Sequence, residues 1–221
     1  MKQLIVTPLF LLFVLSACDV DEILNDAANT NISAKSKLND VLTTARENFA
    51  VDAQLSTLYG FNVSSNGEID LSNPDDNAFI YVVQSDINQS NKFYVPVFGA
   101  GPVESPIDFN DMLSLVKDTT ASNILGNVFT GLSTVHIDPS VSYDDSPAII
   151  EKMLMRSDVS NFRSFHSGSK IDMFLIPGKS IDSTSVTNSA DWIVNFYSET
   201  TSLVLWLHPG NVTGTVTKIS D

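Results

Sequence analysis

The sequence predicts an α+β protein made of two similar units in tandem, each pairing a helix with an antiparallel sheet. Three observations lead to this fold class. In each half of the chain, an amphipathic helical segment precedes runs of β-branched and aromatic residues. Each half also contains two strongly apolar strands separated by a short polar turn. The apolar positions of the halves align without a gap from Val41 to Ile80 when Val41 is placed on Leu154, which suggests an internal duplication.

These patterns divide the chain into five parts. The segment after the signal peptide is assigned as a tether because its residues are small and polar, with few candidates for a core. The predicted parts are a lipoprotein signal peptide at 1–17, the lipidated cysteine and flexible tether at 18–35, a first α+β unit at 36–105, a helical linker at 106–145 and a second α+β unit at 146–221.

The first unit is predicted to begin with a helix over 38–49, capped by Ser36. Its apolar residues recur at helical spacing and form one stripe. Pro96 has no N–H to donate, so the strand that contains it is expected to have a free side there. Strands are expected in the segments rich in β-branched and aromatic residues, at 57–63, 78–85 and 92–98.

The second unit has a sharper start. Ser146 is the predicted N-cap and Pro147 the first helical residue, where the missing proline N–H would be unpaired anyway. In the linker, Asp108 precedes apolar residues at helical spacing as far as Val116, which predicts a separate helix. Strands are predicted at 170–176, 190–198, 202–208 and 212–219.

The alignment of the two halves depends on pattern rather than on identity. The alternative is a chance alignment of two ordinary α+β segments. Beyond the first pair, the alignment places Leu42 on Met155, Phe49 on Phe162, Phe61 on Phe174, Phe79 on Trp192 and Ile80 on Ile193.

The first residues are typical of an export signal. Lys2 is followed by an apolar stretch to Leu15, which is too short to cross a bilayer because a spanning helix needs about 20 residues. The sequence Leu15-Ser16-Ala17-Cys18 resembles the lipobox of bacterial lipoproteins. The resemblance implies that Cys18 is lipid-modified and anchors the chain to a membrane outside the cytosol, on the periplasmic face or at the cell surface. An ordinary cleaved signal peptide and a buried N-terminal helix are the alternatives.

Charge and cysteine content argue against several functions. The chain carries 26 acidic residues against 12 basic ones, for a formal net charge of -14. This balance argues against nucleic acid as a partner, since phosphate binding needs clustered Lys and Arg. Cys18 is the single cysteine, so no intrachain disulfide can form and the folded part has no thiol redox chemistry.

The C-terminal sequence resembles the PepSY-like group of small domains. Segment 201–216 has a hydrophobic strand, a turn at Thr213-Gly214 and the start of a final strand, an ending that these domains often share. The first half departs from this pattern, because it ends in Phe98-Gly99-Ala100-Gly101. The resemblance covers 36–100 and 146–219. It implies two α+β units in tandem and a non-catalytic binding or inhibitory role, and it brings no catalytic residues.

Motifs for catalysis or metal binding are weak, and no cofactor or metal is predicted. His136, His166 and His208 lack zinc-ligand spacing. Segment 167–170 fits S-x-x-K, but its glycine and the strand expected from residue 170 disfavour the helix that this motif needs. An alternating set of oxygen side chains could form a weak Ca²⁺ patch, although the EF-hand pattern is absent: Asn66, Glu68 and Asp70.

Aromatic residues of the last hairpin are the candidate ligand-binding residues. Trp192, Tyr197 and Trp206 lie on the two predicted strands. Helices cover one face of such a sheet, so the other face must meet water, the other unit or a ligand. We expect either that the units pack together through this face or that the face forms a groove for a hydrophobic or peptide ligand.

The sequence therefore predicts a lipid-anchored, non-enzymatic bacterial envelope protein that binds an unknown protein or small molecule. Two alternatives stay open. One is an envelope hydrolase that uses scattered carboxylates, and the other is a structural component of an envelope assembly.

Overall fold

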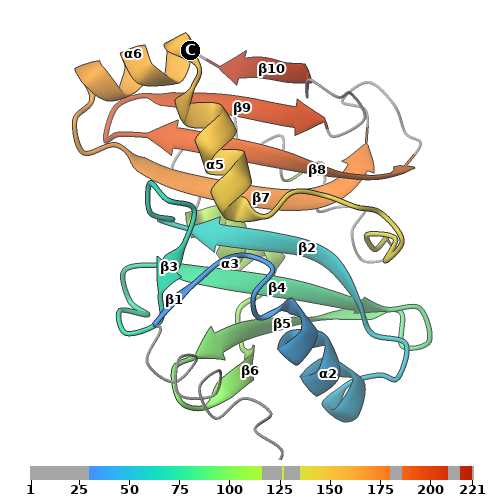
Figure 1. Cartoon of the computed structure of the whole chain (residues 1–221). Helices are drawn as coiled ribbons and strands as arrows, with labels where there is room; N and C mark the ends of the chain where they lie inside the picture. The colour runs from blue at the N-terminus through green and yellow to red at the C-terminus, as the bar shows by residue number, and fades with distance from the viewer. Residues whose placement is uncertain (1–29, 116–125, 127–134, 180–185, 209–214, 221) are drawn as a thin grey trace, which may run out of the picture.

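A computed structural model describes residues 30–115, 126, 135–179, 186–208 and 215–220 (Figure 1). The predicted signal peptide, Cys18 and most of the predicted tether lie outside these residues. The helices are α2 (Leu38–Asn48), α3 (Phe109–Leu115), α5 (Ser146–Leu154) and α6 (Ser157–Phe165). The strands are β1 (Asn31–Ile32), β2 (Gln54–Phe61), β3 (Ile69–Asp70), β4 (Ala78–Ser85), β5 (Ser90–Val97), β6 (Gly101–Ser105), β7 (Lys170–Lys179), β8 (Val186–Tyr197), β9 (Ser202–His208) and β10 (Thr215–Ser220).

One antiparallel sheet runs through the molecule. Its eight strands follow the order β10-β9-β8-β7-β2-β4-β5-β6, while β1 and β3 form a separate two-stranded sheet. The predicted α+β class is confirmed. The strands of the two halves meet edge to edge where β2 pairs with β7, through Leu58↔Leu175, Tyr59↔Phe174 and Gly60↔Met173. The halves thus share a single sheet, and the expected packing of one sheet face on another is not found.

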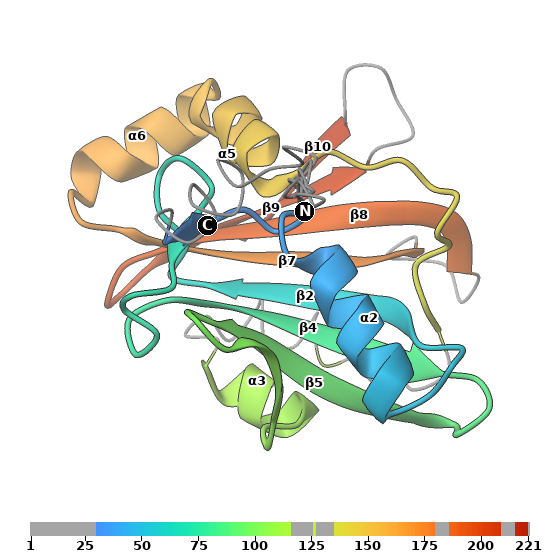
Figure 2. The same cartoon turned by 60° about the horizontal axis from the view of Figure 1, so that its bottom comes forward.

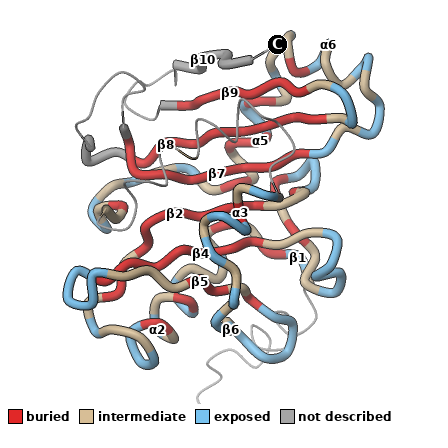
Figure 3. The backbone as a smooth tube through the Cα atoms, turned by 180° about the vertical axis from the view of Figure 1, so that it is seen from behind, coloured by how far each residue is buried: buried red, intermediate tan, exposed pale blue. Residues whose placement is uncertain are grey.

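The helices divide between the two faces of the sheet. Figure 2 shows α2, α5 and α6 on one side and α3 on the other. The larger core lies under α2, α5 and α6 and draws on both halves, with Val41 and Tyr81 from the first and Ile150 and Trp192 from the second. A smaller core lies on the opposite face, where Met112 of α3 packs against the sheet. Most of the central strands are consequently buried along their length (Figure 3).

The start of α5 is held by a network that differs from the predicted cap. Asp145, rather than Ser146, is the N-cap, and its Oδ1 accepts a hydrogen bond from the Ser146 N–H at 2.7 Å. The same carboxylate accepts from the Ser33 hydroxyl at 2.6 Å and from the Lys35 N–H at 3.0 Å. Ser146 Oγ accepts from the Ala34 N–H at 2.9 Å. The segment around residue 34 is therefore fastened to the helix start of the other half.

This attachment corrects the predicted tether at its C-terminal end. Ile32 is 4% exposed and pairs with Ile69 of β3, and Ala34 is 2% exposed. Two isolated apolar residues among polar ones give too weak a pattern to indicate a strand. Ser36 is also not the N-cap of α2, since Lys37 occupies that position and Ser36 Oγ donates to the Ser33 carbonyl instead.

Several other elements differ from the sequence predictions. Pro96 does not face a free edge, because β5 continues to β6 and Pro96 stands opposite Pro102. The second unit has two helices, α5 and α6, where the sequence indicated only one. In the predicted linker, α3 ends at Leu115, and residues 116–125 and 127–134 lie outside the described chain. Among the described residues, no helix is long and apolar enough to span a membrane.

The turn at Gly67 contacts the backbone of α5. Gly67 has a φ of +84°, and a Cβ atom there would lie 2.5 Å from the Cα of Pro147. Two constraints favour glycine at this position. Residues with a Cβ are disfavoured at this φ, and the contact with Pro147 leaves no room for a Cβ. The turn thereby fixes the first half against the helix of the second half.

We expect Gly67→Ala to destabilise the protein by about 2 kcal/mol or more, since the added methyl group must push backbone apart. Gly99→Ala is the matched control, because Gly99 has a similar φ of +73° with nothing within 4 Å of its Cβ position. The measurement is chemical unfolding of both variants. If both variants lose the same free energy of unfolding, then the contact between Gly67 and Pro147 contributes nothing to stability.

Candidate functional site

The two tryptophans predicted to bind ligand are core residues. Trp192 and Trp206 are each 1% exposed, and they lie in the two different cores on opposite faces of the sheet. Trp192 Nε1 donates to the Asp144 carbonyl at 3.1 Å, and Trp206 Nε1 donates to Asp191 Oδ2 at 2.9 Å. The predicted groove through these residues is therefore filled by the protein's own side chains.

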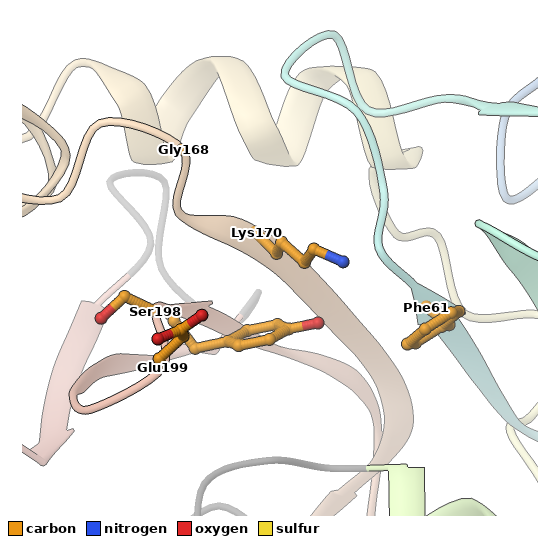
Figure 4. Close-up of a pocket in the computed structure, with 6 residues that line it drawn as sticks. Phe61, Gly168, Lys170, Ser198 and Glu199 are labelled. Carbon is orange, nitrogen blue, oxygen red and sulfur yellow. The ribbon is translucent and has the colours of Figure 1, made fainter.

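Tyr197, the third predicted residue, lines a pocket instead. The pocket has a volume of about 530 Å³ and lies beside the first residues of β7, the last residues of β2 and β8, and the turn after β8 (Figure 4). This volume lies in the range of small-ligand sites, about 300–1,000 Å³. Its described lining residues are Phe61, Gly168, Lys170, Tyr197, Ser198 and Glu199.

The registration of β7 and β8 builds a polar square beside the pocket. Lys170 stands opposite Tyr197, and Asp172 stands opposite Asn195. Residues two apart on a strand share a face, so these four side chains form two adjacent rows. The neighbouring Ile171 belongs to the core under the helices, so the square lies on the opposite face. The sequence thus places polar side chains in β7 and β8, two inner strands of a largely apolar sheet.

Asp172 is the buried acid of this square. It is 0% exposed, and three donors reach its carboxylate: the Asn62 N–H at 2.9 Å and the Tyr197 hydroxyl at 3.3 Å on Oδ1, and the Tyr59 hydroxyl at 3.1 Å on Oδ2. Burial raises the pKa of Asp172 to about 7, although these hydrogen bonds and the charge of Lys170 act in the opposite direction. Loss of water around the charged form therefore outweighs the three hydrogen bonds.

The Asn195 side chain is buried next to Asp172 and has no hydrogen-bond partner among the described residues. Asn195 is 0% exposed, and neither its Oδ1 nor its Nδ2 bonds to a described residue. A buried polar group left in this way costs free energy, so its presence calls for an explanation. Its amide stands directly across from a carboxyl that gains or loses a proton near neutral pH, and an amide can both donate and accept.

Two opposite charges stand at the mouth of the pocket. Lys170 and Glu199 are exposed pocket-lining residues, and no salt bridge joins either to another described residue. Figure 4 shows the Lys170 side chain extending toward Phe61, with Glu199 on the far side of the pocket. The arrangement offers a cation, an anion and aromatic surface to one small space, and can therefore hold a polar ligand by charge and by ring contact.

The other sequence candidates lie elsewhere. His136 Nδ1 is 3.3 Å from Gln84 Oε1, whereas His166 ends α6 against Phe162. The side chain of His208 lies outside the described residues. Segment 167–170 forms a turn and the first residue of β7 rather than a helix, so S-x-x-K catalysis has no support here.

The side chains of the predicted Ca²⁺ patch form hydrogen bonds within two turns. Glu68 Oε2 accepts from Asn66 Nδ2 at 2.7 Å, while Asp70 Oδ1 accepts from Ser72 at 2.8 and 2.9 Å. Each side chain thus serves its own turn. Across the described chain, no group of three His, Cys, Asp or Glu residues is arranged to hold a metal ion.

Sequence reasoning missed the polar square, although a signal was present. Asp172 interrupts a continuous run of apolar residues in β7, and Asn195 does the same in β8. A carboxylate within a buried strand is rarely placed there for stability. What the sequence could not show is that strand registration puts these two positions opposite one another.

Comparisons with protein-family models, with curated proteins and with solved structures gave no match. The assignment of function therefore depends on the geometry of the pocket and on the sequence.

We expect Trp206→Ala to destabilise the protein by about 3–5 kcal/mol, because it empties a large buried volume. Phe165→Ala is the control, since Phe165 is 83% exposed on α6 and its removal should change stability by less than about 0.5 kcal/mol. Thermal unfolding measures both. An unchanged melting point for Trp206→Ala would show that Trp206 does not supply core stability, and Trp206 would again be a candidate for ligand binding.

Asp172 should make the protein less stable as pH rises. Its pKa of about 7 in the folded state lies above the ordinary value of 3.8, so the folded state holds the proton more tightly than the unfolded state. Stability should fall as pH increases from about 4 to about 7, by up to about 4 kcal/mol, and stay low above that. Asp172→Asn should remove this fall, as followed by urea unfolding at several pH values.

The exposed turn residue Asp75 supplies the control, since Asp75→Asn should keep the pH dependence of the parent. If Asp172→Asn and the parent change stability in parallel between pH 4 and pH 8, then Asp172 is already ionised in the folded protein.

Proposed function

We propose that this chain is a lipid-anchored bacterial envelope protein, exposed outside the cytosol, that binds a small ligand without catalysis. The binding site in this proposal is the pocket formed by β2, β7 and β8. The observation that carries the proposal is the gathering of Lys170, Tyr197 and Glu199 around a pocket of about 530 Å³, with the buried polar pair Asp172 and Asn195 behind them. Pockets with a few convergent polar groups and a perturbed acid are common at binding sites.

The anchor is proposed from the sequence. The lipobox-like Leu15-Ser16-Ala17-Cys18 follows a short apolar stretch. Two acyl chains on Cys18 would hold the chain stably at a membrane, whereas one would not. The acidic surface favours insertion of lipid chains over attraction to anionic headgroups as the means of attachment.

We also propose that the sheet arose by duplication of one unit, as in tandem PepSY-like domains. Three features support this. A helix precedes a four-stranded meander in each half, and the strand order is mirrored about the β2–β7 pair. The aligned residues also occupy matching faces: Phe79 and Trp192 lie in the core under the helices, while Ile80 and Ile193 lie in the opposite core.

Binding is favoured over hydrolysis by the state of the two acids near the pocket. Glycoside hydrolysis by a carboxylate pair needs both acids to face one bond. Glu199 lines the pocket, but both oxygens of Asp172 already accept hydrogen bonds from Tyr59, Asn62 and Tyr197. Asp172 is thus committed to holding the fold around the pocket.

Anchoring is tested with the full chain expressed in a bacterium. We expect the parent protein to enter the detergent phase of a Triton X-114 extraction and Cys18→Ser to stay in the aqueous phase. Mass spectrometry should find acyl chains on residue 18 of the parent alone. An unmodified thiol at residue 18 would contradict the proposed anchor.

A further inference from the structure

The charges at the pocket indicate what kind of ligand it holds. Basic residues are scarce in this chain, at 12 against 26 acidic ones, so a free anionic ligand would be repelled at long range. A cationic ligand would be attracted, but the Lys170 ammonium would oppose it inside the pocket. A molecule that carries both charges meets neither difficulty.

The two charged groups are also available. Lys170 and Glu199 line the same pocket and are not joined to each other by a salt bridge. Lys170 offers donors to a carboxylate, and Glu199 offers acceptors to an ammonium group. Charge-assisted hydrogen bonds of this kind are about twice as strong as neutral ones.

The remaining walls suit an apolar or aromatic side chain. Phe61 is half-buried at the end of β2, and Tyr197 is 6% exposed with its hydroxyl held by Asp172. Because that hydroxyl is held, the ring has a fixed orientation. A fixed ring gives contact area at small entropic cost.

We propose that the pocket binds a zwitterionic ligand, a short peptide or amino acid with a free ammonium and a free carboxylate. Lys170 binds the carboxylate, Glu199 binds the ammonium, and the ligand's side chain packs on Phe61 and Tyr197. This inference rests on the proposed function, because it assigns a ligand class to the same pocket.

The test is calorimetric titration of the full chain in detergent micelles at pH 7, with the dipeptide alanyl-phenylalanine as the probe. N-acetyl-alanyl-phenylalanine lacks the ammonium group, and alanyl-phenylalanine amide lacks the carboxylate. We expect the parent to bind the free dipeptide about tenfold more tightly than either capped form.

Two variants assign the two contacts. In Glu199→Gln, the preference over the N-acetylated peptide should disappear while the preference over the amide persists. In Lys170→Met, the opposite should hold. Both side chains are exposed, so folding should be unaffected, and the melting point checks this. Lys92→Met is the matched control, since Lys92 is a half-exposed lysine that pairs with Glu104 across β5 and β6, away from the pocket.

The outcomes separate this inference from the proposed function. If all three peptides bind equally, or if only glucose or N-acetylglucosamine binds, the zwitterion assignment is overturned while a binding pocket remains. If neither the peptides nor the two sugars bind, both the assignment and the proposed pocket function fail.

Discussion

The pairing of β2 with β7 is the contact on which the rest of the molecule depends. Each half contributes four strands to the sheet, and within the sheet the two halves are paired only through β2 and β7. The register contains three residue pairs, and further hydrogen bonds extend the contact: Thr57 Oγ1 donates to the Leu175 carbonyl and the Val63 N–H to the Ile171 carbonyl. Tyr59 stacks on Phe174 with the ring centres 4.5 Å apart. Without this contact, each half would present an open strand edge to solvent.

The candidate site lies where this pairing ends. Phe61 is the last residue of β2, and the next N–H, that of Asn62, donates to Asp172 on β7. Asp172 also binds a tyrosine from each half, Tyr59 and Tyr197. The acid therefore links the two halves at the edge of the pocket. A change in its protonation is therefore a change in the contact between the halves, and so in the stability of the sheet.

The sequence predicted the elements with strong periodicity and missed those without it. The β4 range was predicted at its observed bounds because AFIYVVQS is rich in β-branched and aromatic residues. The helix α6 has only Val159 fully buried, so it lacks the apolar stripe that indicates a helix. The strand β1 has two residues, and β6 contains Gly101 and Pro102, which disfavour a strand prediction.

The site was less predictable than the fold because it depends on registration between distant strands. The tryptophans stood out in the sequence by size, yet large aromatic side chains most often supply core volume. The residues that gather at the pocket are an ordinary lysine, glutamate and tyrosine separated by up to 29 positions, as from Lys170 to Glu199. Only the positions of Asp172 and Asn195 within apolar strands gave any local sign of them.

The asparagine opposite Asp172 is best understood through the two forms of that acid. When Asp172 is ionised, the carboxylate can accept a further hydrogen bond, and the Asn195 amide group can supply one. When Asp172 is protonated, its O–H needs an acceptor; the Asn62 N–H cannot accept, whereas the hydroxyl oxygens of Tyr59 and Tyr197 can accept as well as donate. Asn195, registered opposite Asp172, brings a further acceptor oxygen to the same neighbourhood. An aliphatic residue would serve neither form, whereas an amide serves both. The cost of an unpaired buried amide falls wherever the amide pairs with either form of Asp172, and the raised pKa of Asp172, about 7, brings the change between those two forms close to neutral pH.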